Sequence, residues 1–296
     1  MAATAVMANG STIPNRSLIN QRAICADAAE HVTDTDNIRA SRLSLSTLGD
    51  GFVEAVPDSA FLAMAAQNHG EAIQVPILEA SNGATEVGRF GWKDQHASLL
   101  SFAGDAYVNE MGITNRLFPD ETTTLCEPSG TTTPNDTGND IDQFAEFMRA
   151  TKAPTRGTIT ADVTQGQAIF EQIGCNSCHV ETLVTAAAGT TIHAGTFTVP
   201  AALGGKQFHP FGDFLLHDVG TGDGIVQNGP ADTQYKMRTM PLWGLRTRSQ
   251  LMHDAQSSTY EDAILRHRGE AANEALAFLR LSTAQKNLLY EFLGSL

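Results

Sequence analysis

Apolar residues recur at helical spacing in several short stretches, and the clearest of these is the C-terminal end of the chain. Ser282 and Gln285, three positions apart, form a capping-box pattern that is typical of a helix N-terminus. The apolar stripe that follows consists of Leu288, Leu289, Phe292, Leu293 and Leu296. Because these positions share one face of a helix, the pattern predicts a helix over residues 282–296.

Five further stretches combine helical spacing with helix-start signals. They are residues 57–67, 95–112, 140–151, 165–175 and 258–270. The fourth is expected to be capped by Asp162 or Thr164, and the fifth to begin near Thr259. Segments 121–140 and 185–235 are rich in turn-forming residues and read as loops, with a short hairpin in the second. Without internal repeats or strong strand alternation, the sequence predicts a mainly α fold.

Residues 152–158, KAPTRGT, are the best candidate for a linker. They divide the chain into a loop-rich helical domain, residues 1–155, and a second domain, residues 156–296. With 42% hydrophobic residues, the chain has ample material for a packed core.

The formal net charge of −14, from 33 acidic and 19 basic residues, narrows the choice of partners. A field of this sign repels phosphate backbones and anionic lipid, which argues against nucleic acid and membrane surfaces. It suits a basic redox partner protein, although solubility alone also explains it. No apolar run reaches the roughly 18 to 20 residues of a spanning helix. Nothing in the sequence defines the oligomeric state.

Cys175, Cys178 and His179 form a Cys-x-x-Cys-His motif at the end of a predicted helix. A structural zinc site needs four ligands, and the remaining cysteines, Cys25 and Cys126, are isolated. A thioredoxin-type pair lies at the start of a helix, not after its end. Covalent haem attachment uses all three residues, because both thiols bond the haem and the imidazole binds its iron. The motif therefore predicts a haem c site with His179 as an axial ligand.

The sixth position of such an iron decides much of the function. A second protein ligand favours electron transfer, whereas an open site favours peroxide chemistry. Residue chemistry alone does not rank the candidates, which are His193, His209, His217, His253, His267, Met237, Met240 and Met252.

Several motifs beyond the haem motif occur in a recognisable order. They are GRFGWK (88–93), MGITN (111–115), LFPDE (117–121), GQAIFEQIGCNSCHV (166–180), LLHDVG (215–220), MRTMPLWGL (237–245), LMHD (251–254) and DAILRHRGEA (262–271). With them, the chain resembles the bacterial di-haem cytochrome c peroxidase superfamily, in particular the C-terminal portion of its di-haem (thiol) oxidoreductase branch. The resemblance implies that residues 156–296 form a cytochrome c-like haem domain.

The resemblance also implies roles for individual residues. Cys175, Cys178 and His179 would hold the second haem of the family, and His267 falls at the position of its sixth ligand, with Met252 and Met240 as alternatives. Trp92 matches the tryptophan between the two haems. Glu110 matches the acid near the peroxide-binding haem.

The chain departs from the family pattern in three ways. The family's first Cys-x-x-Cys-His motif is absent, which predicts one haem per chain, and no export signal precedes a site that is normally loaded in the periplasm or another extracytoplasmic space. A truncated N-terminus would explain both absences. Ala255 replaces a family glycine, so a left-handed turn there would be strained. Cys25 and Cys126 either form a disulfide or remain free thiols.

Two functions follow as expectations. The first is a haem c electron-transfer protein without chemistry on a bound substrate. The alternative is a peroxidase-type di-haem oxidoreductase, an enzyme that would need the missing first haem region.

Overall fold

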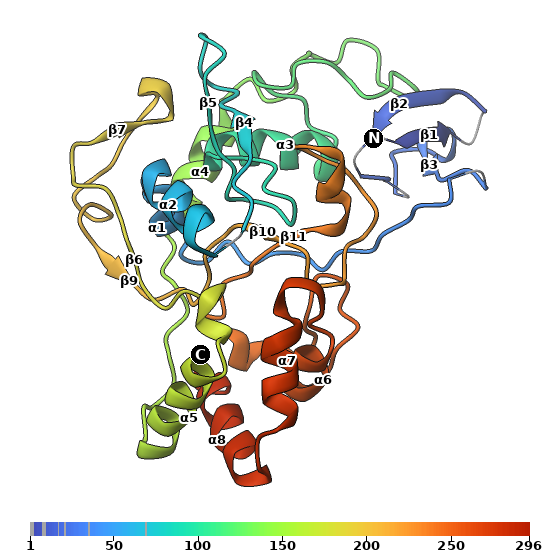
Figure 1. The fold of residues 1–296 in the computed structure, drawn as a ribbon. Coiled ribbons are helices and arrows are strands. Elements are labelled where there is room, and N and C mark those ends of the chain that lie inside the picture. Colours follow the sequence, from blue (N-terminus) through green and yellow to red (C-terminus); the bar gives the residue numbers. More distant parts are fainter. Residues whose placement is uncertain (1–2, 8–9, 17, 21, 35, 69) are drawn as a thin grey trace.

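The structure is a computed structural model that describes residues 3–7, 10–16, 18–20, 22–34, 36–68 and 70–296 (Figure 1). The α-helices among them are α1 (Asp50–Glu54), α2 (Asp58–Asn68), α3 (Leu99–Met111), α4 (Asp140–Ala150), α5 (Ala161–Gln172), α6 (Tyr260–Leu265), α7 (Ala272–Leu279) and α8 (Thr283–Leu293). Figure 1 shows α1 to α4 in one body and α5 to α8 grouped below it. Within the described ranges, no helix is both long and apolar enough to cross a membrane.

The strands are short and form small antiparallel sheets. The N-terminal sheet has the order β2-β1-β3 and contains β1 (Ala3–Met7), β2 (Thr12–Arg16) and β3 (Glu30–His31). The two-stranded pairs are β4 (Gln74–Pro76) with β5 (Thr85–Val87), β6 (Leu183–Val184) with β9 (Gln207–Phe208), β7 (Thr191–Ile192) with β8 (Phe197–Thr198), and β10 (Leu216–His217) with β11 (Met237–Arg238). The fold is therefore helix-rich but mixed, where the sequence predicted a mainly α fold. Ladders of two or three residues are too short to show an alternating pattern.

The helix predictions are confirmed in place but not at every end. The Ser282–Gln285 capping box begins α8, and Thr259 caps α6. The cap of α5 is Thr160, whose side chain accepts from the Val163 amide, and not Asp162 or Thr164. Helix α6 ends at Leu265 instead of continuing to residue 270.

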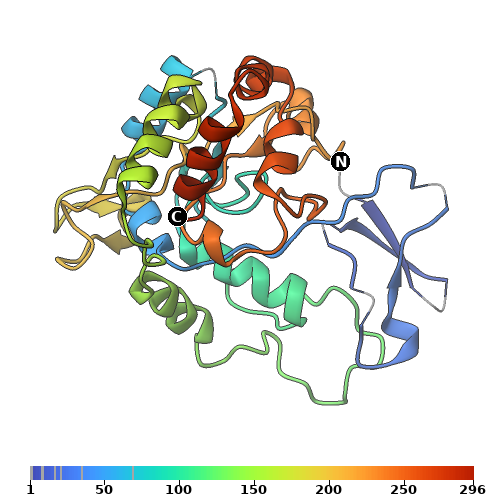
Figure 2. The same ribbon diagram turned by 90° about the horizontal axis from the view of Figure 1, so that it is seen from below.

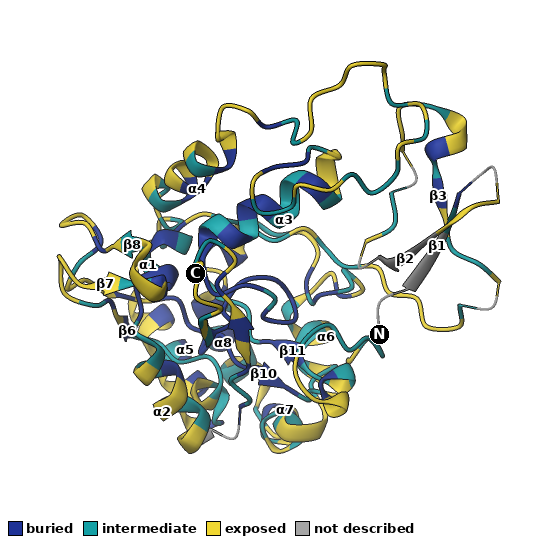
Figure 3. Ribbon diagram, turned by 90° about the horizontal axis from the view of Figure 1, so that it is seen from above, coloured by how far each residue is buried: buried dark blue, intermediate teal, exposed yellow. Residues whose placement is uncertain are grey.

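Two large hydrophobic cores lie in the two groups of helices (Figure 3). The second core packs side chains of α5, α6, α7 and α8 together, among them Phe170, Phe278 and Phe292. The first core joins side chains of α1 to α4 with residues from the later half of the chain. These are Leu183, Phe208, Phe214, Leu215 and Trp243. The division at residue 155 stays a prediction.

An extended segment, residues 36–47, crosses between the two groups of helices, and we call it the strap (Figures 1 and 2). The Leu43 amide donates to the His253 carbonyl at 2.7 Å, and Trp92 Nε1 donates to the Leu43 carbonyl at 2.7 Å. Arg42 forms an ion pair with Asp223 at 2.6 Å. Residues far apart in sequence thus hold the strap in place.

A disulfide ties the region before the strap to a distant loop. It joins Cys25 to Cys126, across 101 residues of sequence. The structure thereby decides between the two predicted states of these cysteines in favour of the bridge.

Candidate functional site

The Cys-x-x-Cys-His motif lies on a tight turn directly after α5. Gly174 ends the helix in the left-handed region, with φ of 92°, which glycine adopts without a Cβ clash. A single 3₁₀ turn, Cys175–Ser177, follows, and the His179 amide donates to the Cys175 carbonyl at 3.0 Å. Both thiols and the imidazole therefore come from one compact turn.

The His179 ring is fixed by a backbone carbonyl. Its Nδ1 lies 3.1 Å from the Phe211 carbonyl, so Nδ1–H donates and Nε2 keeps its lone pair. Burial, together with the neighbouring His267, lowers the pKa of His179 to about 4. The imidazole is thus neutral near neutral pH, which is the form that binds a metal.

His267 faces His179 from the end of α6. Its Nδ1 lies 2.8 Å from the Ala263 carbonyl, which again leaves Nε2 as the free ring nitrogen, and burial lowers its pKa. The two ring centres are 6.5 Å apart, with 58° between the ring planes. Metal–imidazole bonds are about 2 Å long, so two histidines on opposite sides of one iron need roughly 6 Å between ring centres. The observed separation fits such a pair.

These side chains line one largely apolar cavity, which we call the haem cavity. It contains about 1500 Å³ of empty space, counting its open mouth. The predicted residues in its wall are Trp92, Cys175, Cys178, His179, His217, Met237, Met240, Met252, His253 and His267. Phe170, which is 3% exposed, closes it beside His179, with 6.2 Å between the ring centres. Apolar walls and few polar groups are the usual lining of a cofactor site.

The two methionine alternatives also line the haem cavity. The Met240 sulfur accepts from Arg238 Nη2 at 3.3 Å, which engages one side of the thioether. Met252 stands in the left-handed region, with φ of 64°. His267 differs from both because its ring centre lies 6.5 Å from that of His179 and its Nε2 is not engaged by the Ala263 carbonyl.

The Cys175 thiol is not set up for thiol chemistry. Burial raises the pKa of Cys175 to about 12, and nearby Glu274 adds to the effect. A thiol that stays protonated is a weak nucleophile. The burial of Cys175 therefore gives no support to a thiol-redox centre.

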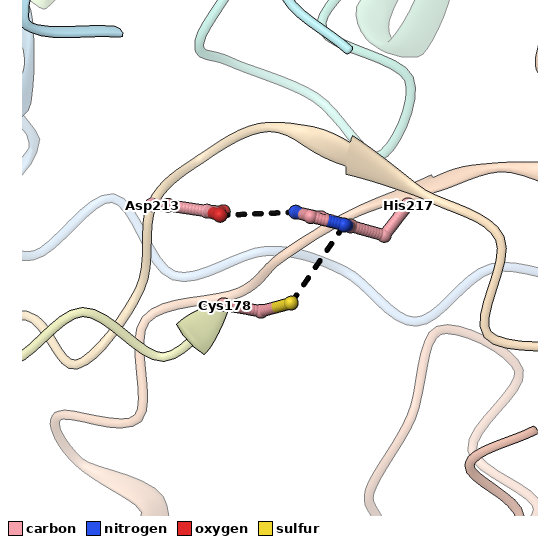
Figure 4. A group of neighbouring side chains, drawn as sticks. All are labelled: Cys178, Asp213 and His217. Atoms are coloured by element: carbon pink, nitrogen blue, oxygen red, sulfur yellow. Dashed lines mark hydrogen bonds and ion pairs between the residues drawn. The ribbon is translucent and has the colours of Figure 1, made fainter. Parts of the chain in front are cut away.

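Cys178 belongs to a second cluster, with Asp213 and His217, that the sequence did not indicate (Figure 4). His217 Nε2 lies 2.9 Å from Asp213, and its Nδ1 lies 2.8 Å from Glu270 and 3.7 Å from the Cys178 sulfur. Burial alone would lower the pKa of His217, but its bonds to Asp213 and Cys178 outweigh burial and raise it to about 11. A protonated imidazole has no lone pair for a metal, so this cluster is an ion-pair network.

The two predicted catalytic residues lie in different surroundings. Trp92, 8% exposed, lines the haem cavity, and its ring centre is 6.0 Å from that of His253. Glu110 lies exposed on the last turn of α3 and is not among the residues that line the cavity. The structure thus brings Trp92 to the histidine pair and leaves Glu110 apart.

Comparison with known proteins gives the class of the chain. The family described as "Di-haem oxidoreductase, putative peroxidase" matches residues 22–296. The chain belongs to this di-haem oxidoreductase family. Its correspondence to the C-terminal portion of the family stays a prediction.

Two solved structures are similar in outline. One is titled as hydrazine synthase of Kuenenia stuttgartiensis pressurised with xenon, at 16% identity and a TM-score of 0.38; the match covers 66% of this chain and 60% of that one. The other is titled as a MauG-like protein associated with microbial copper homeostasis, at 14% identity and a TM-score of 0.41, covering 89% and 94%. Similarity at this level supports no conclusion about this chain's chemistry. No curated protein matches the chain significantly.

Proposed function

We propose that this chain is a haem c electron-transfer protein of the di-haem oxidoreductase family. The observation that carries the proposal is the pair of imidazoles, His179 and His267, which line the same apolar cavity as Cys175 and Cys178 and bond backbone carbonyls through Nδ1, so that Nε2 is left for a metal. Haem c, when bound there, supplies an iron that changes between two oxidation states.

Each residue has a separate part in this proposal. Cys175 and Cys178 bond the haem covalently, while His179 and His267 are the axial ligands. The Phe211 and Ala263 carbonyls hold the two rings in the required tautomer. With both axial positions filled by protein, no open site is left for peroxide, which favours electron transfer over catalysis.

The residues of this chain support one covalently bound haem. A second haem c would need another pair of free cysteines. The two that remain, Cys25 and Cys126, are joined to each other. The division into a first domain, residues 1–155, and a haem domain, residues 156–296, is part of the same proposal.

A peroxidase-type di-haem oxidoreductase is the second candidate function. The family description and the place of Trp92 on the cavity wall favour it. In that case Trp92 would pass electrons from this site to a second haem outside the chain, and Glu110 would serve near that haem.

The disulfide and the net charge support a cellular location and a kind of partner for the protein. Disulfides persist in oxidising compartments, so the Cys25–Cys126 bridge supports a periplasmic or other extracytoplasmic location. The net charge of −14 supports a redox partner with a basic contact surface.

Haem content and spin state test the proposal. The chain is expressed with a periplasmic leader and haem-maturation proteins, and a pyridine haemochrome assay counts the haem. We expect one haem per chain, low-spin spectra and no peroxide turnover. A chain without haem, or a high-spin ferric iron with peroxide turnover, would contradict electron transfer.

Replacement of the sixth ligand tests the site. We expect His267→Ala to convert the iron to high spin, because one axial position then loses its imidazole. His209→Ala is the matched control, since His209 is an exposed histidine bonded to Thr182, and it should leave the spectrum unchanged. A low-spin spectrum in His267→Ala would direct the assignment to Met252 or Met240.

A further inference from the structure

A second, polar pocket adjoins the haem cavity. It contains about 1180 Å³ of empty space, counting its mouth, and lies between the strap, the 220–223 loop, and residues 253–268. Thr221 and His253 belong to the walls of both cavities. The pocket is therefore a polar extension of the haem cavity.

The charges in this polar pocket leave an excess of positive groups. Its two acids are already paired: Asp254 with Arg266, and Asp223 with both Arg42 and Lys93. Two guanidinium groups of the pocket wall remain, those of Arg39 and Arg268.

Among the described residues, these two groups have no carboxylate partner. Arg39 donates only to the backbone carbonyls of Asp36 and Thr33. The stem of Arg268 packs against Gly220, next to Thr221. In a chain with a net charge of −14, an uncompensated basic pocket calls for an anionic ligand.

Buried polar atoms without partners lie at the junction of the two cavities. His253 is 6% exposed, and its Nε2 donates to the Thr221 carbonyl at 2.6 Å. His253 Nδ1 and Thr221 Oγ1 are buried, and neither has a hydrogen-bond partner in the described part of the chain. Leaving a buried polar group unpaired is costly, so a ligand that accepts from the Thr221 hydroxyl would gain affinity.

We propose that a carboxylate binds at this junction, held by Arg268 and the Thr221 hydroxyl. A carboxylate accepts several hydrogen bonds at once, which satisfies a guanidinium and a hydroxyl together. Two sources supply this chemistry: a propionate of haem bound as proposed above, or a free dicarboxylate. The first source rests on the proposed function.

The test uses haem-loaded protein and three variants. Arg268→Gln and Thr221→Val remove the proposed contacts, and Arg280→Gln is the control, since Arg280 is an exposed arginine at the end of α7. Reduction potential and calorimetric titration with succinate are measured for each. Arg268 is exposed, so its variant tests the site even if Thr221→Val does not fold.

Each source predicts its own result. With a propionate at the junction, Arg268→Gln lowers the reduction potential because a positive charge near the haem is lost, and succinate does not bind. With a free dicarboxylate, succinate binds and Arg268→Gln weakens it about tenfold or more, whereas Arg280→Gln has no effect.

An unchanged potential together with no succinate binding would overturn the carboxylate site. Binding that is equal in Arg268→Gln and Arg280→Gln would overturn it as well. A chain that carries no haem contradicts the proposed function instead, and the succinate titration then tests the site by itself.

Discussion

Ala255 shows how a single backbone conformation stores strain beside the site. It stands in the left-handed region, with φ of 59°, just after the LMHD motif. The sequence anticipated strain if a turn formed here, because the resembling family has glycine at this place. For a residue with a Cβ, this conformation costs roughly 1 to 2 kcal/mol.

Relief of this strain is measurable. We expect Ala255→Gly to raise the free energy of unfolding by about 0.5 to 1 kcal/mol in urea titrations, since the gain is offset by the greater entropy of glycine in the unfolded chain. Ala29→Gly is the control, because Ala29 has φ of −69° and should lose stability instead. A loss of stability in both variants would refute the argument.

At the scale of elements, the haem motif depends on the contact between α5 and α8. Gly166 lets the helices approach so closely that a Cβ at this position would lie 2.0 Å from the Leu288 carbonyl. The obstacle is backbone, which cannot rotate away. Helix α5 leads directly into the turn with both cysteines, so this contact also positions the motif.

Filling this contact should disturb both packing and haem binding. We expect Gly166→Ala to lower the free energy of unfolding by about 1 to 3 kcal/mol or more, as overpacked cores do. The exposed Gln165→Ala on the same helix should change it by less than about 0.5 kcal/mol. Thermal unfolding with haem quantification measures both effects, and equal stability of the two variants would contradict the role of Gly166.

The β7–β8 hairpin is held to the first core by buried charges. His193 Nδ1 lies 2.8 Å from Glu86, and its Nε2 lies 3.4 Å from Glu54, which also binds Arg149 at 2.7 Å. Burial of Glu54 would raise its pKa, but its bonds to His193 and Arg149 lower it to about 2. Burial likewise opposes the charged form of His193, yet its bonds to Glu54 and Glu86 raise the pKa of this imidazole.

The directions of these two pKa shifts define the pH range in which the cluster stabilises the fold. The Glu54 contribution is complete above its usual value near 4.5 and is lost as pH falls toward 2. The His193 contribution is complete below its usual value near 6.5 and is lost as pH rises through the raised value. We expect stability from this cluster to be greatest between these limits.

A substitution tests the cluster. Glu54→Gln should lower the free energy of unfolding by up to about 3 to 5 kcal/mol. It removes the fully buried carboxylate that Arg149 and His193 share, and each then keeps only a more exposed partner, Glu146 or Glu86. Glu146→Gln is the control, since it removes an exposed partner of the same Arg149. If urea titrations from pH 3 to 8 give parallel curves for Glu54→Gln and the unmodified chain, the cluster is not the source of the pH dependence.

At the scale of the whole molecule, the disulfide and the strap tie the N-terminal region to both groups of helices. A bridge across 101 residues removes much freedom from the unfolded chain. The strap adds two hydrogen bonds at Leu43, whose carbonyl accepts from the Trp92 indole and whose amide donates to the His253 carbonyl.

Removal of the bridge should therefore reduce global stability. We expect the double substitution Cys25→Ser with Cys126→Ser to lower the free energy of unfolding by about 2 to 4 kcal/mol. A thiol reductant should destabilise the unmodified chain and leave the double variant unchanged. Equal sensitivity of both proteins to the reductant would rule out this bridge as the cause.

Local chemistry explains which parts of the site the sequence could predict. The haem motif could be recognised in the sequence because its three residues lie within one turn. The assignment of His267 came from the family resemblance. His217 and His253 were only two of several ligand candidates, since their partners lie 4, 32, 39 and 53 residues away. Their actual contacts arise only when distant loops meet.

The fold was predictable to a similar extent. Helices with a full apolar stripe or a capping box, such as α8 and α3, were found close to their observed ends. The N-terminal sheet was missed because its strands are short and lack clear alternation. Helix α6 was predicted too long because its early stop before Gly269, with φ of 50°, depends on the loop at Asp218.

The path of the strap also determines the order in which parts of a newly made chain can fold. Leu43 is locked by a backbone bond to residue 253, so this crossing cannot close until most of the polypeptide has been synthesised. Cys175 and Cys178 emerge before that point. A haem attached as proposed above would therefore have an interval in which both sulfurs are still reachable from outside.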